Sequence, residues 1–400
     1  MFGLEARGDS VQTGRMTLTP SRRSAVAPFL AMDVMEAASR ADAAGRNIAR
    51  LEVGQPGAPA PQIARDAVTR AMRDGTGGGY TVALGMPALR ERLSRMYAEI
   101  HGLDVPAERI VVTTGSSAGF LLAFLTLFDA GARMALADPG YPSYRNILSS
   151  IDIEPVRLEA TLATGYQPDP ALLAAARADG RIDGLLFASP ANPTGTALSR
   201  EALAALIADC RAHGTAMISD EIYDRLWYVE KPVSALELTQ DAFVINSFSK
   251  YYCMTGWRVG WMVVPSGMVR TVERLAQNHS ICPPHIGQIA ALAALDAEEE
   301  LAGHLDVYRR NRALLLDTLP ALGFRDFAPA DGAFYLYADV SALTNDSMDF
   351  SRRMLDEAGV AAVSGLDFDP VRGGTTMRLS FAGSTETVER AAQSLTRWLG

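Results

Sequence analysis

A lysine at position 250 is the most informative residue for chemistry in this sequence. It lies in the segment SFSKYYCMTGWRVGW, residues 247–261, and is one of only two lysines among 37 basic residues. A lysine amine can lose its proton and attack a carbonyl group, whereas the guanidinium of arginine cannot. We therefore interpret Lys250 as a nucleophile, and Lys231, which precedes a proline in a polar turn, as a surface lysine.

An acidic and a phenolic side chain precede this lysine, in the segment DEIYD of residues 220–224. Asp220 could keep a pyridine nitrogen protonated, so that the ring accepts electrons, or it could simply cap a turn. Tyr223 could donate a hydrogen bond to a ring oxygen, or it could pack in the core. Both residues suit the chemistry of an electron-accepting cofactor.

Further side chains could bind a phosphate and a carboxylate. The segment TGSSAGF places Gly115, Ser116 and Ser117 where a strand turns into a helix, which favours either an anion site or a plain capped helix start. Arg258 could pair with the same anion or form a structural ion pair. Arg378 interrupts the apolar run TMRLSFA and therefore needs a carboxylate, from a ligand or from an internal salt bridge.

Two more candidates lie in turns rich in proline. Asn192, in SPANPTG, could reach a ring oxygen or a substrate carboxylate, or it could only shape the turn. Tyr141, in PGYPSY, could stack on a planar cofactor or belong to the core.

The elements that must position these residues follow a βαβ rhythm. From about residue 105, short apolar runs alternate with polar turns and helical stretches, at residues 109–113, 133–138, 184–189, 215–220, 242–246 and 259–264. The runs lack the alternation of half-exposed strands, which favours a doubly wound, mostly parallel sheet. Ligands of such sheets bind beyond the carboxyl ends of the strands, where most of the candidate residues lie.

The order of the elements predicts two domains. A large cofactor-binding α/β domain is expected at residues 51–275 and a smaller α+β domain at residues 276–400. Residues 1–50 form an N-terminal extension with a helix at 28–44, part of which packs with the smaller domain. The strands of that domain are expected at 333–340 and 376–382.

Composition excludes several classes of protein. The net charge of −9, without a basic block, argues against nucleic acid, and no apolar stretch is long enough to cross a membrane. The N-terminus lacks the apolar region of a secretory signal. The three cysteines and five histidines show no metal-binding spacing, so we expect a cytoplasmic protein without a metal.

Taken together, these motifs resemble the class I/II pyridoxal phosphate-dependent aminotransferases of fold type I, the aspartate aminotransferase superfamily. The resemblance runs from LEVGQPG at residue 51 through TTGSSAG, DPGYPSY, ANPTG, SDEIYD and SFSK with TGWRVGW to MRLSFA. It implies a large domain with a seven-stranded, mostly parallel sheet between helices, and a smaller α+β domain. It also implies ping-pong transfer of an amino group between an L-amino acid and a 2-oxo acid.

The resemblance assigns roles to the candidate residues. Lys250 would bind the cofactor covalently and move the proton of the substrate's α-carbon, and Asp220 would pair with the pyridine nitrogen. Tyr223 and Asn192 would bind the phenolic oxygen, and Tyr141 would lie over the ring. The phosphate would be held by Gly115, Ser116, Ser117, Ser247 and Arg258, with Ser249 as a further candidate, and the α-carboxylate by Arg378, Asn192 and the backbone of Gly54.

The family resemblance also implies a homodimer with shared active sites, because the tyrosine of the GYT segment, here Tyr80, would reach the phosphate of the neighbouring subunit. One departure is visible: SGLDFDP, from residue 364, replaces the proline–glycine and phenylalanine–glycine pattern that is frequent in relatives. Residues 276–296 contain no additional arginine for a second carboxylate, although the neighbouring subunit could provide one. Their composition favours a substrate with a neutral side chain, which could be aliphatic, aromatic or sulfur-containing.

Three alternative functions remain. A carbon–sulfur β-lyase could use the same scaffold, because the same carbanion can expel a β-substituent. A non-catalytic cofactor-binding sensor would need a DNA-binding domain, for which the N-terminal extension is too short. A nicotinamide dehydrogenase would suit the sheet, but no GxGxxG follows the early strands.

Overall fold

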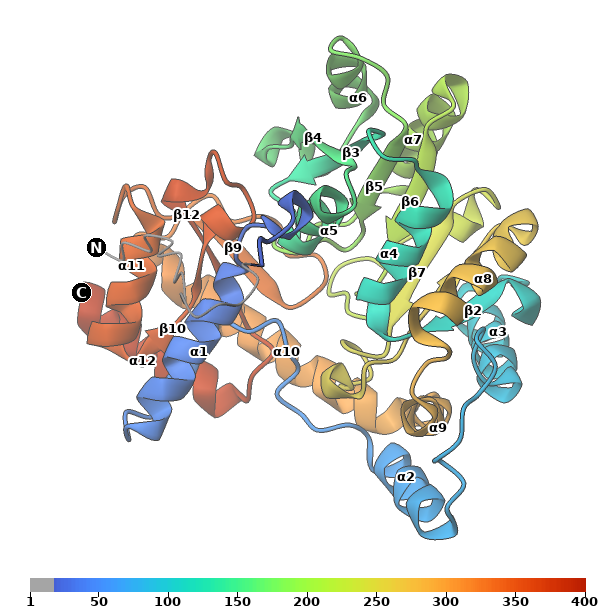
Figure 1. Cartoon of the computed structure of the whole chain (residues 1–400). Helices are drawn as coiled ribbons and strands as arrows, with labels where there is room; N and C mark the ends of the chain where they lie inside the picture. The colour runs from blue at the N-terminus through green and yellow to red at the C-terminus, as the bar shows by residue number, and fades with distance from the viewer. Residues whose placement is uncertain (1–17) are drawn as a thin grey trace.

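The computed structural model describes residues 18–400, so the first 17 residues of the predicted N-terminal extension lie outside the described residues. A seven-stranded sheet forms the centre of the larger lobe (Figure 1). Only β8 runs antiparallel to its neighbours. The mostly parallel sheet predicted from the sequence is therefore confirmed. The strands lie in the order β2 (Ile110–Thr113), β8 (Gly260–Val263), β7 (Phe243–Ser247), β6 (Ala216–Asp220), β5 (Gly184–Ala188), β3 (Arg133–Asp138) and β4 (Glu154–Glu159).

Successive residues of the inner strands pack on opposite faces of this sheet. Leu186 of β5 joins the apolar cluster beneath α4, α5 and α8, whereas its neighbours Leu185 and Phe187 join the cluster beneath α3 and α7. Burial on both faces explains why the sequences of these strands are continuous runs of apolar residues. The helices of this lobe are α3 (Pro87–His101), α4 (Gly115–Leu127), α5 (Pro142–Ser150), α6 (Pro170–Arg177), α7 (Arg200–His213) and α8 (Val269–Ser280).

Strand β4 was not among the apolar runs of the sequence. It is one of the two edge strands of the sheet, its sequence EPVRLE contains a proline, and it pairs only with β3. Charged residues and proline are typical of sheet edges, where one side of the strand has no partner. A search for continuous apolar runs therefore misses such a strand.

A smaller lobe contains helix α1 (Leu30–Ala43) and the C-terminal end of the chain (Figure 1). Its antiparallel sheet has the order β11 (Val363–Ser364), β12 (Thr376–Ser380), β9 (Tyr335–Asp339), and a short parallel pair joins β1 (Ala49–Arg50) to β10 (Val360–Ala361). The helices of this lobe include α1, α11 (Ser347–Arg353) and α12 (Thr385–Leu399). Pairing of β1 with β10 explains how residues near the start of the chain become part of a lobe made mostly of its end.

Three helices occupy most of residues 269–318, between the large sheet and the strands of the smaller lobe. Helix α8 ends before a break with two consecutive prolines, Pro283 and Pro284, and α9 (His285–Ala294) and α10 (Glu298–Thr318) follow. Proline removes a backbone donor, which explains the break. Helix α2 (Gln62–Asp74) projects from the body of the molecule and packs on α9 (Figure 1). The predicted boundaries of the domains, at residues 50 and 275, stay a prediction.

Within residues 18–400, no helix combines the length and the apolar character that crossing a lipid bilayer requires.

Candidate active site

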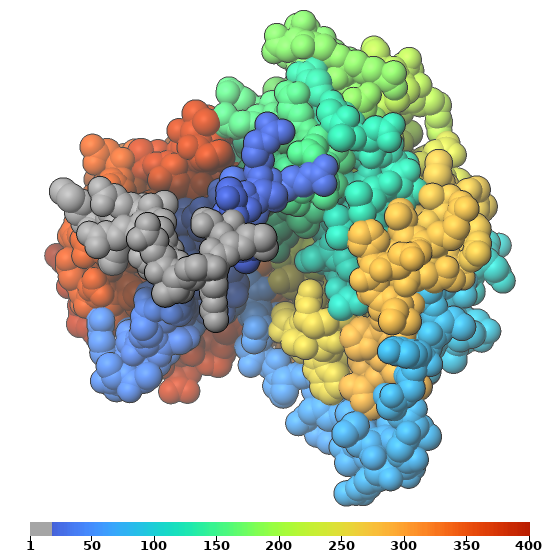
Figure 2. Space-filling view, viewed as in Figure 1, coloured from blue at the N-terminus to red at the C-terminus, as the bar shows by residue number. Residues whose placement is uncertain are grey.

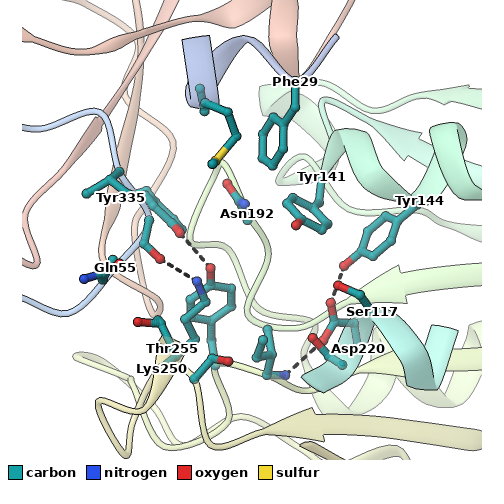
Figure 3. A pocket seen from close by; sticks show the side chains of 18 of the residues that line it. Phe29, Gln55, Ser117, Tyr141, Tyr144, Asn192, Asp220, Lys250, Thr255 and Tyr335 are labelled. Atoms are coloured by element: carbon teal, nitrogen blue, oxygen red, sulfur yellow. Dashed lines mark hydrogen bonds between the residues drawn. The ribbon is translucent and has the colours of Figure 1, made fainter. Parts of the chain in front are cut away.

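A cavity of about 220 Å³ lies between the carboxyl ends of the central strands and the smaller lobe (Figure 3). Most of the residues singled out in the sequence line it, although they come from segments more than 300 residues apart. Its lining includes Phe29, Met32, Gly54, Ser116, Ser117, Tyr141, Tyr144, Asn192, Asp220, Tyr223, Ser249, Lys250, Arg258, Tyr335 and Arg378. The fold thus brings together the amine, the carboxylate, the amide and the two arginines.

The amine of Lys250 points into this cavity. Its Nζ donates a hydrogen bond to the carbonyl oxygen of Gly54 and lies 5.8 Å from the centre of the Tyr223 ring. Burial, reinforced by the positive charge of Arg378, lowers the pKa of the Lys250 amine from 10.5 to about 7, and Asp220 opposes this shift. Near neutral pH, a large fraction of the amine is therefore unprotonated and nucleophilic.

The carboxylate of Asp220 ends β6 at the bottom of the cavity and is 3% exposed. It accepts hydrogen bonds from the Tyr144 hydroxyl and, at 3.0 Å, from the Ile222 amide, so it stabilises the following turn and also faces the cavity. Burial raises the pKa of Asp220 to about 6, and the two hydrogen bonds together with the charge of Lys250 oppose that rise. Asp220 can therefore cap the turn and also remain available to a ring nitrogen, the two roles that the sequence left open.

Arg378 is 2% exposed and is held flat between two aromatic rings. Its guanidinium carbon lies 4.5 Å from the centre of the Tyr335 ring and 4.7 Å from that of Phe368. One Nη donates to Asn192 Oδ1 at 3.1 Å, and the other donates to the carbonyl oxygen of Glu52. These contacts fix the orientation of the guanidinium at the wall of the cavity.

The charge of Arg378 has no acidic partner among the side chains of residues 18–400, since the nearby Glu52 pairs with Arg50 at 2.7 Å. The Nε–H of Arg378 is buried and has no hydrogen-bond partner. A buried donor without a partner costs about 1–3 kcal/mol, and more when it is charged, whereas cation–π contacts recover about 0.5–2 kcal/mol each. The internal salt bridge that the sequence left open is therefore absent, and a ligand carboxylate would satisfy the remaining donor.

The start of α4 has the features of an anion site. Its N-cap residue Thr114 forms no side-chain cap, and its first turn contains no acidic residue, so no side chain of that turn or cap neutralises the helix start beside the lining residues Ser116 and Ser117. Gly115 has φ +71°, and a Cβ there would lie 2.5 Å from the Arg258 guanidinium. A side chain at position 115 would thus displace the cation that lies against the helix start.

The remaining predicted site residues divide into two groups. Tyr141 lines the cavity to the right of Asn192 in Figure 3, and the Tyr223 hydroxyl shares a hydrogen bond of 2.7 Å with Tyr335. Gly115, Ser247 and Tyr80 are not among the lining residues. Ser247 is buried and its hydroxyl bonds to Ser249 at 2.9 Å, whereas the side chain of Tyr80 is 81% exposed. The cavity of one chain therefore does not include Tyr80.

Sequence reasoning missed several residues that line or border the cavity. Tyr144 follows Tyr141 by three residues, which is the spacing of one helix face, and could have been found from the motif PGYPSY. Tyr335 lies in the strand expected at residues 333–340, but nothing local distinguishes it from a core aromatic. Phe29 and Phe368 depend on contacts between the two ends of the chain, for which the sequence gives no local signal.

Metal ligands are absent from the described part of the chain: no three histidine, cysteine, aspartate or glutamate side chains of residues 18–400 are grouped to hold an ion.

Comparison with known proteins agrees with the geometry. The model of the family "Aminotransferase class I and II" matches residues 46–395, so the chain belongs to this family of pyridoxal phosphate-dependent enzymes. It is an aminotransferase with the fold type I architecture, and the β-lyase, sensor and dehydrogenase alternatives are not favoured.

Individual relatives cover nearly the whole chain. A valine–pyruvate aminotransferase of Mycobacterium tuberculosis is 46% identical over 388 residues, covering 96% of this chain and 99% of the relative. The crystal structure of an aminotransferase from the same species has a TM-score of 0.92 at 45% identity, covering 96% of this chain and 99% of that one. Aspartate aminotransferase from Thermus thermophilus with maleate has a TM-score of 0.88 at 30% identity, covering 95% of this chain and 100% of that one.

The residues present fit pyridoxal phosphate. An amine with a lowered pKa suits its aldehyde, a buried carboxylate suits its ring nitrogen, and the uncapped start of α4 beside Arg258 suits its phosphate. Each feature is an observation on a different segment of the chain, and all three border one cavity.

Proposed function

We propose that this aminotransferase moves the amino group of a small, neutral L-amino acid to a 2-oxo acid such as pyruvate, with Lys250 as its catalytic base. The observation that carries the proposal is the shared cavity of Lys250, Asp220 and Arg378, in which burial and neighbouring cations favour an unprotonated amine. The three groups suit the three parts of an amino acid reaction: proton transfer, electron withdrawal and carboxylate binding.

Pyridoxal phosphate, when bound, supplies an aldehyde that condenses with amines and a ring that accepts electrons. Arg378 binds the substrate's α-carboxylate through its free Nε–H and an Nη, with the amide of Asn192 and the backbone of Gly54 beside it. This contact orients the α-carbon. The Lys250 amine takes the proton from the α-carbon of the donor. In the second half of the reaction it returns a proton to the α-carbon of the accepting 2-oxo acid.

Asp220 holds a proton at the pyridine nitrogen, and the Tyr144 hydroxyl orients the carboxylate for that task. Tyr223 and Asn192 line the same cavity and would supply hydrogen bonds for the phenolic oxygen, and Tyr141 would help to exclude water from the bound ring. Gly115, Ser116, Ser117, Ser247 and Arg258 form the phosphate-binding set, in which Ser247 acts through its hydrogen bond to Ser249. We therefore assign the catalytic roles to Lys250, Asp220 and Tyr223.

The charges that line the cavity support a neutral substrate side chain. Each of the three cations that the described residues place along the cavity already has a role. Arg258 lies at the start of α4, Lys250 interacts with Asp220, and Arg378 is assigned to the α-carboxylate. No further cation from residues 18–400 lines the cavity and remains for a second carboxylate. Similarity to a valine–pyruvate aminotransferase supports the same donor class.

The donor is tested by a screen of about twenty L-amino acids at a fixed pyruvate concentration, with product alanine measured by mass spectrometry. Because the carboxylate of an aspartate side chain would be buried without a partner, we expect valine and other aliphatic donors to exceed aspartate in kcat/KM by about 10²-fold or more. Release of pyruvate and ammonia from cystathionine without an added oxo acid would instead favour the eliminating reaction. Equal rates with aspartate and valine would contradict the donor assignment.

We also infer a homodimer in which Tyr80 of each chain completes the phosphate site of the other. The projecting helix α2 and the exposed side chains of Ile63, Met72, Tyr80, Val82 and Ile281 support an interface on this side. Sedimentation should give twice the chain mass of 42.9 kDa. Mixed dimers of Tyr80→Phe and Lys250→Ala chains should regain one site with both wild-type residues, and a monomeric active enzyme would contradict the inference.

The acidic net charge and the reduced cysteines support a cytoplasmic enzyme of amino acid biosynthesis that acts on small molecules without nucleic acid or membrane partners.

A further inference from the structure

Helix α1 begins without a cap of its own. Its N-cap residue is Phe29, whose side chain has no acceptor, and no side-chain cap is present. Instead, the carboxylate of Asp367 accepts hydrogen bonds from the amides of Leu30 at 3.0 Å and Ala31 at 3.1 Å. Asp367 is 1% exposed and lies more than 330 residues away in the chain. It therefore caps α1 from the opposite end of the sequence.

The loop that carries this carboxylate also contacts the carboxylate-binding arginine. The next residue, Phe368, places its ring 4.7 Å from the Arg378 guanidinium. The carbonyl oxygen of Asp367 accepts a hydrogen bond from Arg145 of α5, so the loop is tied to the large lobe as well. The start of α1, the position of Arg378 and the large lobe are thus connected through two adjacent residues.

The capped start of α1 directs apolar side chains into the cavity. Phe29 packs edge-on against Tyr141, with ring centres 5.7 Å apart (Figure 3). Met32, about one helical turn later, also lines the cavity. Ala31 and Phe368 belong to one apolar cluster, against which Phe29 also packs. The wall of the cavity opposite Lys250 is therefore an aromatic ring and a thioether without a hydrogen-bond donor that could serve a charged substrate.

Other contacts that hold the chain before α1 are exposed. Arg23 pairs with Asp152, but their side chains are 62% and 45% exposed, and the Asn146 amide reaches the Ala27 carbonyl at 3.3 Å. Exposed ion pairs contribute little, whereas a buried carboxylate that accepts two amides is held firmly. In Figure 2 the start of the described chain, in dark blue, lies between the two lobes. Asp367 is consequently the main anchor of this segment.

We propose that Phe29 and Met32 contact the substrate's side chain and select an aliphatic one, and that Asp367 is the positioning residue that holds them over the cavity and couples them to Arg378. The proposal rests on the proposed function, because it assigns a substrate class to the same site. An acidic side chain against this wall would lose its hydration without gaining a partner, and is disfavoured for that reason.

The first test compares donors in cofactor-loaded variants. Phe29→Ala should lower kcat/KM for valine by about tenfold or more and narrow the preference for valine over aspartate. Asp367→Ala should do the same mainly through KM, because Lys250 and Asp220 remain in place, and Asp367→Asn, which keeps one acceptor oxygen, should be intermediate. Asp346→Ala is the matched control: Asp346 caps α11 by accepting from Met348 and Asp349 at 3.0 Å each, and it does not line the cavity.

The second test follows hydrogen exchange of the Leu30 and Ala31 amides. Isovalerate, an aliphatic carboxylate without an amino group, should slow their exchange in the wild type and in Asp346→Ala, but not in Asp367→Ala. Equal behaviour of Asp367→Ala and Asp346→Ala in both tests would overturn the proposal, as would an unchanged donor preference in Phe29→Ala. If Asp367→Ala does not fold, Asp367→Asn provides the comparison. Failure of the wild type to transaminate any amino acid would refute the proposed function, while the exchange experiment would still decide whether Asp367 couples α1 to carboxylate binding.

Discussion

Replacement of Lys250 by alanine is expected to lower transamination by about 10⁴-fold or more, because the substitution removes both the amine that binds the cofactor and the base that moves the α-proton. Lys250→Arg should be equally inactive, since a guanidinium keeps its proton. Production of the 2-oxo acid from valine, followed by mass spectrometry, measures the loss.

The second lysine of the chain, Lys231, provides a control for this experiment. Its Nζ donates to the Ile100 carbonyl at 2.7 Å on the surface. Lys231→Ala should therefore retain wild-type turnover and the full visible absorbance of the bound cofactor. A Lys250→Ala variant with normal turnover and an unchanged absorbance band would show that another group carries the chemistry.

The lowered pKa of Lys250 adds a pH dependence to the same prediction. An amine with a pKa of about 7 is mostly protonated at pH 5 and mostly neutral at pH 8. Covalent capture of pyridoxal phosphate by the cofactor-free protein should therefore accelerate about tenfold per pH unit below 7 and level off above 8. Borohydride reduction and peptide mass analysis measure it. An ordinary lysine would give rates that keep rising toward pH 10.

Much of the fold could be predicted because its signals are local. The inner strands of the large sheet are continuous apolar runs, and residues that follow them meet at one edge, which is why Lys250 and Asp220 were expected together. The edge strand β4 is polar and contains Pro155, so the same reasoning did not detect it. The other edge strand, β2, is buried and was predicted, so the local pattern detects strands by their burial rather than by their place in the sheet.

The parts of the site that were missed depend on contacts between distant segments. Arg378 was expected to need a partner, but the rings of Tyr335 and Phe368 that hold it come from two other segments of the smaller lobe. Phe29 reaches the cavity only because Asp367 caps α1 from the far end of the chain. Such pairs leave no periodicity in the sequence, whereas each member alone looks like an ordinary core aromatic or surface acid.

Asp220→Ala is expected to reduce turnover by about 10²–10³-fold, because it removes the preorganised charge that favours electron withdrawal during proton transfer. Cofactor binding should weaken much less, since the start of α4 and Lys250 remain. Asp220→Asn tests charge at constant shape and should be nearly as slow as alanine. Single-turnover mixing with valine separates the chemical step from binding, and an Asp220→Ala enzyme with a wild-type chemical step would contradict the role.

Tyr144→Phe separates the orientation of this carboxylate from its charge. The Tyr144 hydroxyl donates to Asp220 and opposes the rise of its pKa, which burial places at about 6. Without that donor the pKa of Asp220 rises further, so the loss of activity on acidification should begin at a higher pH than in the wild type. Near pH 8, where the carboxylate stays ionised in both enzymes, the variant should be slowed by only about tenfold. Phe120, which packs on Tyr144 with ring centres 5.1 Å apart, offers the control: Phe120→Leu alters packing without removing a donor and should leave the acidic limb in place. An acidic limb that moves equally in both variants would mean that packing, rather than the hydrogen bond, sets the charge state of Asp220.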